Sequence, residues 1–125
     1  MPRVADYRTI VDAPFSLQAN QIKPFFFSMP SGFHSASRSI LFFQFIKPEG
    51  ATIDLRIHLN NPQQAIWRGI ITGDTEFHSL HETINPNTLK QEGNDLSFFS
   101  EGSSDIDQTN PVRIGDVFIL CQVDI

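Results

Sequence analysis

Hydrophobic and polar residues alternate along this chain in short segments, and no window keeps the 3.6-residue period of an amphipathic helix. The clearest segment is "IDLRIHLN" at 53–60, where four aliphatic residues alternate with four polar ones. A period of two over this length predicts a half-buried β-strand, with one face in a core and the other in solvent.

Similar segments recur along the chain, and eight prolines and seven glycines punctuate it. Such spacing is typical of short strands in a sandwich or barrel. The segments that favour strands are 22–30, 39–47, 53–60, 65–72, 76–84, 94–101 and 112–125. The pattern therefore predicts an all-β protein, a single jelly-roll β-sandwich domain over residues 1–125. It has two antiparallel sheets, about eight strands and one short helical turn.

The helical turn is predicted within "NPNTLKQEGNDLSFF" at 85–99. Pro86 starts a turn, "TLKQE" favours one helical winding, and Gly93 can end it with a positive φ. Leu89 is the one apolar residue of the winding, so we expect it to close one end of the sandwich. The segment is then a strand-entry corner set by backbone needs.

Composition and charge narrow the classes of partner. Twelve phenylalanines, against one Trp and one Tyr, predict a core built on phenylalanine. A net charge of −5 argues against nucleic acid or an anionic membrane as partner, because both reward basic surfaces. Residues 1–73 hold seven Lys/Arg against four Asp/Glu, a net +3, and residues 74–125 hold two against ten, a net −8. This asymmetry predicts either one acidic edge or a plain solvated surface.

A lone cysteine, Cys121, excludes an internal disulfide and is expected to be a small buried hydrophobe. The N-terminus shows no basic region followed by an apolar run, so no signal peptide is visible. The apolar runs are too short to cross a bilayer. We expect a protein of the cytoplasm, or one released without a visible signal peptide, that does not insert into membranes.

The end of the chain combines a proline-marked turn, a Leu-Lys pair, a Gly-Asn pair, an apolar strand, and a final strand with an aspartate before its hydrophobic run. The positions are Pro86, Leu89, Lys90, Gly93, Asn94, Leu96, Phe98, Asp116, Val117 and Ile119. This pattern resembles galactose-binding-like domains, jelly-roll sandwiches found among carbohydrate-binding modules. The resemblance implies ligand binding in loops at one end of the fold. Some members hold calcium through an N-terminal carboxylate cluster that this chain lacks, so no cofactor is expected.

Metal and catalytic sites find little support in the sequence. His78 and His81 are three residues apart, which on a strand places them on opposite faces, away from a shared metal. No Gly-Ser-Gly elbow, phosphate loop or Cys–His pairing is present. No spacing requires a carboxylate pair such as Asp54 with Glu82 to meet. We therefore expect neither a metal site nor an enzyme.

A carbohydrate site needs an aromatic ring for the apolar face of a sugar and amides or charged groups for its hydroxyls. The candidates are Trp67, Arg68, His34, Asn60, Asn61, Gln63, Asp74 and Glu76. The alternative for Trp67, which we favour, is that it is simply a core residue.

Several strands are apolar on both faces, although a two-layer sandwich buries only one. The residues left over are Phe42, Ile46, Phe118 and Leu120, with Phe26 and Phe99 raising the same question. Either another subunit covers them or the loop at 28–39 does. The sequence thus predicts a non-catalytic, lectin-like carbohydrate-binding module that forms homo-oligomers. The alternative is an assembly protein that docks through an apolar sheet face.

Overall fold

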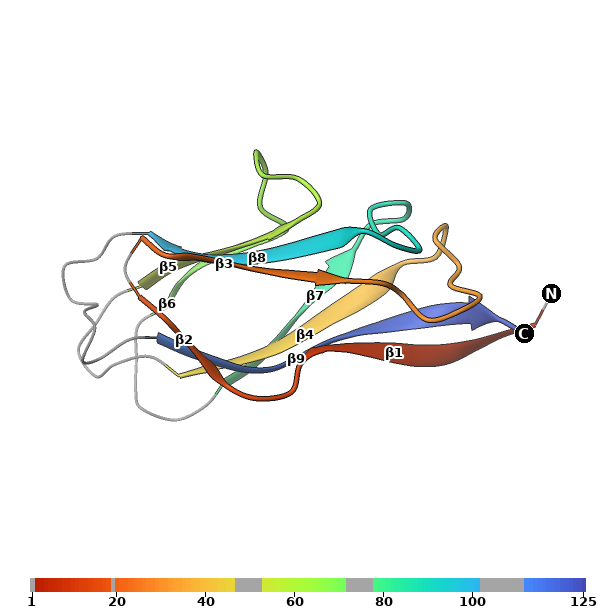
Figure 1. Cartoon of the computed structure of the whole chain (residues 1–125), viewed down its shortest axis with the longest axis horizontal. Helices are drawn as coiled ribbons and strands as arrows, with labels where there is room; N and C mark the ends of the chain where they lie inside the picture. The colour runs from red at the N-terminus through yellow and green to blue at the C-terminus, as the bar shows by residue number, and fades with distance from the viewer. Residues whose placement is uncertain (1, 19, 47–52, 72–77, 102–111) are drawn as a thin grey trace.

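The computed structural model describes residues 2–18, 20–46, 53–71, 78–101 and 112–125. Two sheets lie face to face, and no helix occurs within these ranges (Figure 1). The strands are β1 (Arg3–Val11), β2 (Phe15–Leu17), β3 (Ile22–Phe27), β4 (Ser39–Ile46), β5 (Ile53–Leu59), β6 (Trp67–Ile71), β7 (His78–Ile84), β8 (Asn94–Glu101) and β9 (Val112–Asp124).

The sheet order is that of a jelly roll. The first sheet runs β1-β9-β4-β7, with β2 also paired to β9, and the second runs β3-β8-β5-β6. Every pairing is antiparallel. From β3 onward the chain alternates between the sheets, except at the β5–β6 hairpin, as expected where Greek keys wrap two sheets around one core. The predicted all-β sandwich of two antiparallel sheets is confirmed.

The strands that the hydrophobic pattern did not single out are β1 and β2. Most side chains of β1 are exposed, including those on the side that faces the interior elsewhere in the sheet. A strand with little burial on either face has no reason to alternate, so its sequence carries no period of two.

The core lies between the sheets and is rich in phenylalanine, as predicted. The ring of Phe98 lies 5.4 Å from that of Phe15, 6.1 Å from Phe25 and 6.5 Å from Phe43. The buried apolar residues are Leu17, Phe27, Met29, Leu41, Phe43, Phe45, Leu55, Ile57, Leu59, Ile84, Leu89, Leu96, Phe98, Val112, Ile114, Val117, Ile119, Cys121 and Val123. Burial raises the pKa of the Cys121 thiol to about 11, with a further contribution from Asp6, so this cysteine is a neutral core residue at pH 7.

Leu89 is buried, as predicted, but the segment around it is not helical. Residues 86–92 form turns and bends, and Gly93 follows with φ of +73°. In this segment side chains form hydrogen bonds with backbone N–H and C=O groups that a helix would pair with each other. Asn94 accepts from Lys90 N at 2.9 Å and donates to Lys90 O at 2.7 Å, and Asn60 donates to Thr88 O at 2.9 Å. The predicted helical turn is therefore wrong.

A β-bulge in β9 sets the two faces of the longest strand. The register against β4 shifts between Phe42 and Gln44, beside Asp116, whose φ is +48°. Because a bulge adds a residue to one strand, Ile114 and Val117 both face the core, although an ideal strand would separate them.

The loop that precedes β4 extends the first sheet instead of folding over Phe42 and Phe118. Asp124 N donates to Gly32 O at 2.8 Å, and His34 N donates to Gln122 O at 2.9 Å. Gly32 has φ of +80°, and a Cβ there would meet Asp124 O at 2.8 Å. Only glycine allows the loop to approach the end of β9 so closely.

Candidate functional site

A pocket of about 540 Å³ lies on the outer face of the second sheet, beneath the loop that joins β5 to β6. In Figure 1 this loop, in green, stands off the sheet. We call this site the outer pocket. Its lining residues are Ile22, Arg56, His58, Asn60, Asn61, Pro62, Gln63, Lys90, Gly93, Asp95, Ser97 and Phe99.

Strand alternation supplies the floor of the outer pocket. The same period that sends Leu55, Ile57 and Leu59 into the core turns Arg56 and His58 outward. Register then brings residues from distant parts of the chain together, with His58 opposite Ser97 and Arg56 opposite Phe99.

One side of this face is apolar. Ile22 on β3 lies opposite Phe99, and Phe26 lies opposite Asp95. The exposed fractions are 63% for Ile22 and 75% for Phe26. An aromatic ring this exposed on an otherwise regular strand contributes little to the core. Together with Phe99 it gives the second sheet an apolar outer margin beside the polar pocket residues.

The imidazole of His58 is oriented by the loop above it. Its Nδ1 lies 3.1 Å from Asn61 O, and because a carbonyl only accepts, Nδ1 carries the proton. This tautomer leaves Nε2 available to a ligand, and Nε2 has no partner within the described residues. Asn61 Oδ1 accepts from Gln63 N at 2.9 Å, which holds the loop in a tight turn.

Asn60 fixes the point where β5 enters this loop. It adopts φ of +56°, a left-handed conformation that asparagine tolerates better than most residues. Its side chain accepts from Asp95 N at 2.7 Å and donates to Asn94 Oδ1 at 2.9 Å. The side-chain amide of Asn60 therefore bonds other residues of the protein. Asn60 positions the loop beside the pocket and does not itself bind a ligand through this amide.

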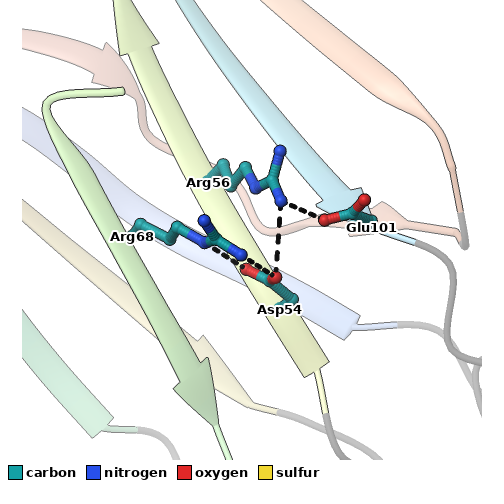
Figure 2. Close-up of polar contacts among 4 residues, drawn as sticks. All are labelled: Asp54, Arg56, Arg68 and Glu101. Carbon is teal, nitrogen blue, oxygen red and sulfur yellow. Dashed lines mark hydrogen bonds and ion pairs between the residues drawn. The ribbon is translucent and has the colours of Figure 1, made fainter. Parts of the chain in front are cut away.

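Four charged side chains form an ionic cluster at one end of the outer face (Figure 2). Arg68 binds Asp54 through two bonds, Nε to Oδ1 at 3.2 Å and Nη2 to Oδ2 at 2.9 Å. Arg56 lies between Asp54, at 3.6 Å, and Glu101. The two arginines are cross-strand neighbours, so the carboxylates offset their repulsion. The hydrogen bond from Arg68, with the positive charges of both arginines, lowers the pKa of Asp54.

The structure separates the sequence-predicted ligand residues. Asn60, Asn61 and Gln63 line the outer pocket, and Arg68 belongs to the ionic cluster. Trp67 packs against the core, with its ring 5.2 Å from Phe43 in an edge-to-face contact. The core alternative therefore describes Trp67, and its ring is not part of the outer pocket.

His34 lies in the loop between β3 and β4, beside the first sheet. There Arg3 donates to its Nδ1 at 3.1 Å and to Ser37 Oγ at 2.8 Å. Asp74 and Glu76 lie outside the described residues, as does the side chain of Ile46. The pocket residues that the sequence did not nominate are Ile22, Arg56, His58, Pro62, Lys90, Gly93, Asp95, Ser97 and Phe99. The alternation of apolar and polar residues at 53–60 places Arg56 and His58 on the outer face of the strand. This is the sequence feature from which the site could have been predicted.

A second hollow of about 430 Å³ lies beside the same loop, against the end of β7. We call it the edge pocket. Its polar side chains include Asn61, Gln64, Glu82 and Asn85. Asn61 lines both hollows, so the β5–β6 loop forms the wall between them.

The outer face of the first sheet is apolar at its centre. The rings of Phe42 and Phe118 stack at 4.9 Å with 11° between their planes, and His81 lies 5.9 Å from Phe42. Leu120 lies opposite Ile40 on the same face, and all four apolar side chains are half-buried. The prediction that Phe42, Phe118 and Leu120 point away from the core is therefore confirmed.

Metal-binding residues do not gather in the part of the chain that is described: no group of three or more His, Cys, Asp or Glu occurs there. His81 contacts Phe42 on the outer face, whereas His78 stacks on Phe45, a core residue, at 5.5 Å. The two histidines are therefore on opposite faces, as predicted. The described segments also contain no helix able to span a membrane.

No family model and no curated protein matches this sequence. Solved structures do match in fold. PorU from Porphyromonas gingivalis, in its dimeric latent form, superposes with a TM-score of 0.75 at 10% identity, over 99% of this chain. This chain spans only 13% of PorU.

Two smaller structures also match. The EclA C-terminal domain, described as a sugar-binding protein, gives a TM-score of 0.58 at 13% identity, over 95% of this chain and 79% of its own. CBM29_1, a family 29 carbohydrate-binding module from Piromyces equi, gives 0.53 at 7% identity, over 94% of this chain and 91% of its own. This chain shares their β-sandwich fold. The predicted resemblance to carbohydrate-binding modules is confirmed at the level of fold.

Proposed function

We propose that this protein is a non-catalytic carbohydrate-binding module that holds a sugar in the outer pocket. One observation carries the proposal. The exposed side chains of Ile22 and Phe26 and the half-buried ring of Phe99 lie on the same sheet face as the polar side chains that line the outer pocket. Apolar side chains that gather on an exposed face, in contrast to single ones, mark binding surfaces on soluble proteins.

The chemistry of this face fits a sugar ring. A pyranose has an apolar face of C–H groups, which stacks on an aromatic ring, and a rim of hydroxyls that both donate and accept. The outer pocket offers His58 Nε2, the Gln63 amide, the Lys90 ammonium and the Asp95 carboxylate, whose Oδ1 also accepts from Ser97 Oγ at 3.1 Å. Donors and acceptors are both present, as hydroxyl recognition requires.

The fold comparisons support the proposal. A sugar-binding domain and a carbohydrate-binding module use this sandwich, at identities of 13% and 7%. Loops and outer faces vary freely at such identities, so the fold supplies the scaffold and the residues of this chain must supply the ligand preference.

A glycan array with fluorescently labelled protein tests the proposal, run once with calcium and once with a chelator. We expect reproducible binding to a related set of glycans that does not change with chelator, because no described residues form a cation site. An array without binding at high protein concentration would reject a carbohydrate ligand.

The alternative from the sequence, an assembly protein, has support of its own. The Phe42–Phe118 stack and Leu120 give the first sheet an apolar outer surface. The two functions are compatible, since weak sugar sites gain avidity when subunits are linked. A blank glycan array, together with self-association in solution, would favour the assembly function alone.

A further inference from the structure

The edge of the first sheet is formed by β1, which pairs only with β9 among the described strands. Figure 1 shows β1, in red, at the margin of this sheet, where it runs beyond the end of the second sheet toward the chain termini. A strand of nine residues is long for an edge, and on one side it presents a row of backbone groups that have no backbone partner among the described residues.

A side-chain contact shows which backbone groups of β1 face outward. Asp6 Oδ1 accepts the N–H of Tyr7 at 2.8 Å. An amide bonded to its neighbour's carboxylate points away from the β9 ladder. Because the N–H and C=O of every second residue share a direction in an antiparallel strand, Ala5 and Thr9 present their backbone groups on the same free side.

The side chains of β1 are also poised for contact. Val4 and Tyr7 are 45% and 63% exposed, two of the most exposed large apolar residues in the described structure. Asp6 and Arg8 lie on the opposite face from Tyr7. Within the described residues neither has an ion-pair partner in its own chain.

We propose that β1 is a self-complementary dimerisation edge, in which two copies of this chain pair antiparallel with Tyr7 opposite Tyr7 of the second copy. Tyr7 and its counterpart then exchange backbone hydrogen bonds, and Ala5 does so with Thr9 of the second copy. The first sheets of both copies become one continuous sheet.

Charge complementarity selects this register. With Tyr7 at the two-fold axis, Asp6 of each copy lies directly opposite Arg8 of the other. These are non-hydrogen-bonded pairs, in which opposing side chains approach most closely. In a single copy the Asp6 carboxylate accepts the Tyr7 N–H. In the dimer this N–H bonds the backbone of the second copy, so the Asp6 carboxylate becomes available to pair with Arg8. The register shift between Thr9 and Val11 ends the regular edge just beyond the paired segment.

The dimer would also extend the apolar face of the first sheet. Tyr7 lies beside Leu120, and Thr9 beside Phe118, in the register with β9. Two copies joined at Tyr7 therefore bring their Leu120 and Phe118 surfaces onto one side of a shared sheet. This places the self-association predicted from the sequence at the sheet edge, with the apolar face adjoining it, and leaves both outer pockets free.

Sedimentation equilibrium of the full chain, at concentrations up to about 1 mM, the upper range for weak complexes, tests the edge. We expect a concentration-dependent dimer that weakens with salt, because two exposed ion pairs contribute to it. Asp6→Arg and Arg8→Asp should each raise the dimer dissociation constant about tenfold or more, since each replaces both attractions with like-charge repulsion.

Rescue tests the register. An equimolar mixture of the Asp6→Arg and Arg8→Asp proteins should form a heterodimer, because an arginine of one protein then faces an aspartate of the other in both cross-strand pairs. The variant that carries both substitutions should dimerise like the original chain. Glu92→Arg and Arg113→Asp make the same charge changes at other exposed positions and should have no effect. Circular dichroism verifies that each variant is folded. The proposal would be overturned if the original chain were monomeric. It would also be overturned if the single variants dimerised normally, or if their mixture stayed monomeric.

Discussion

Asn60 and Asn94 are joined by an amide–amide hydrogen bond, with Nδ2 of Asn60 2.9 Å from Oδ1 of Asn94. The bond links the start of the β5–β6 loop to the start of β8. Asn94 is fully buried and also bonds Lys90 N, Lys90 O and Phe27 O. Two walls of the outer pocket therefore depend on one buried side chain.

Replacing Asn94 with alanine should destabilise the protein by about 3 kcal/mol, because the substitution removes four hydrogen bonds that hold Lys90 N, Lys90 O, Phe27 O and the Asn60 amide. Urea unfolding followed by circular dichroism measures the change. Asn85→Ala, an exposed asparagine on the adjoining segment, is the control and should stay within about 0.5 kcal/mol of the original. Equal effects of the two substitutions would contradict the structural role given to Asn94.

Phe26→Ala should weaken glycan binding about tenfold with little change in stability, because a ring that is 75% exposed packs against little. Isothermal titration with a glycan identified on the array measures the affinity. Phe118→Ala is the matched control, since it removes an outward-facing phenylalanine from the other sheet, and it should bind as the original does. Loss of binding in Phe118→Ala alone would move the site to the first sheet.

Gly69→Ala should destabilise the protein by about 1 to 3 kcal/mol through overpacking. A Cβ at Gly69 would lie 2.6 Å from the indole ring of Trp67, which must shift against Phe43. Trp67 is the only tryptophan, so its fluorescence reports the shift directly. Gly115→Ala, where a Cβ meets Pro14 at an ordinary 3.5 Å, is the control and should leave the emission unchanged.

The ionic cluster should make the stability of the folded protein depend on pH in the acid range. Arg68 lowers the pKa of Asp54 below its ordinary value of 3.8, so the folded state favours the carboxylate. The stabilisation is present above the unfolded-state pKa and is lost as pH falls through the lower folded-state value. Between pH 5 and 2, Asp54→Asn should therefore lose less stability than the original chain in thermal unfolding. A parallel decline of the two proteins would mean that Asp54 does not contribute.

The sequence predicted the fold because alternation encodes which face of a strand is buried. Leu55, Ile57 and Leu59 were placed inward by period alone, and the structure buries all three. The prediction failed where side chains from afar control the backbone. No local pattern shows that Asn60 will bond Thr88 O, which is why the segment after Pro86 was expected to be helical.

The candidate site was only partly predictable for a related reason. Alternation turned His58 outward, but register decides which neighbours it meets, and Ser97 lies 39 positions along the chain. Phe26 was recognised as apolar on a face that should be polar, yet its place beside the outer pocket depends on the pairing of β3 with β8. Trp67 was nominated by residue type, whereas its contact with Phe43 places it in the core.

The most direct test of the proposed function is a nuclear magnetic resonance titration of isotope-labelled protein with a glycan identified on the array. We predict that the largest amide shifts will fall within 22–26, 56–63 and 90–99, the segments that form the outer pocket and its apolar margin. Shifts confined to the edge pocket or to the outer face of the first sheet would contradict the assignment of the sugar site.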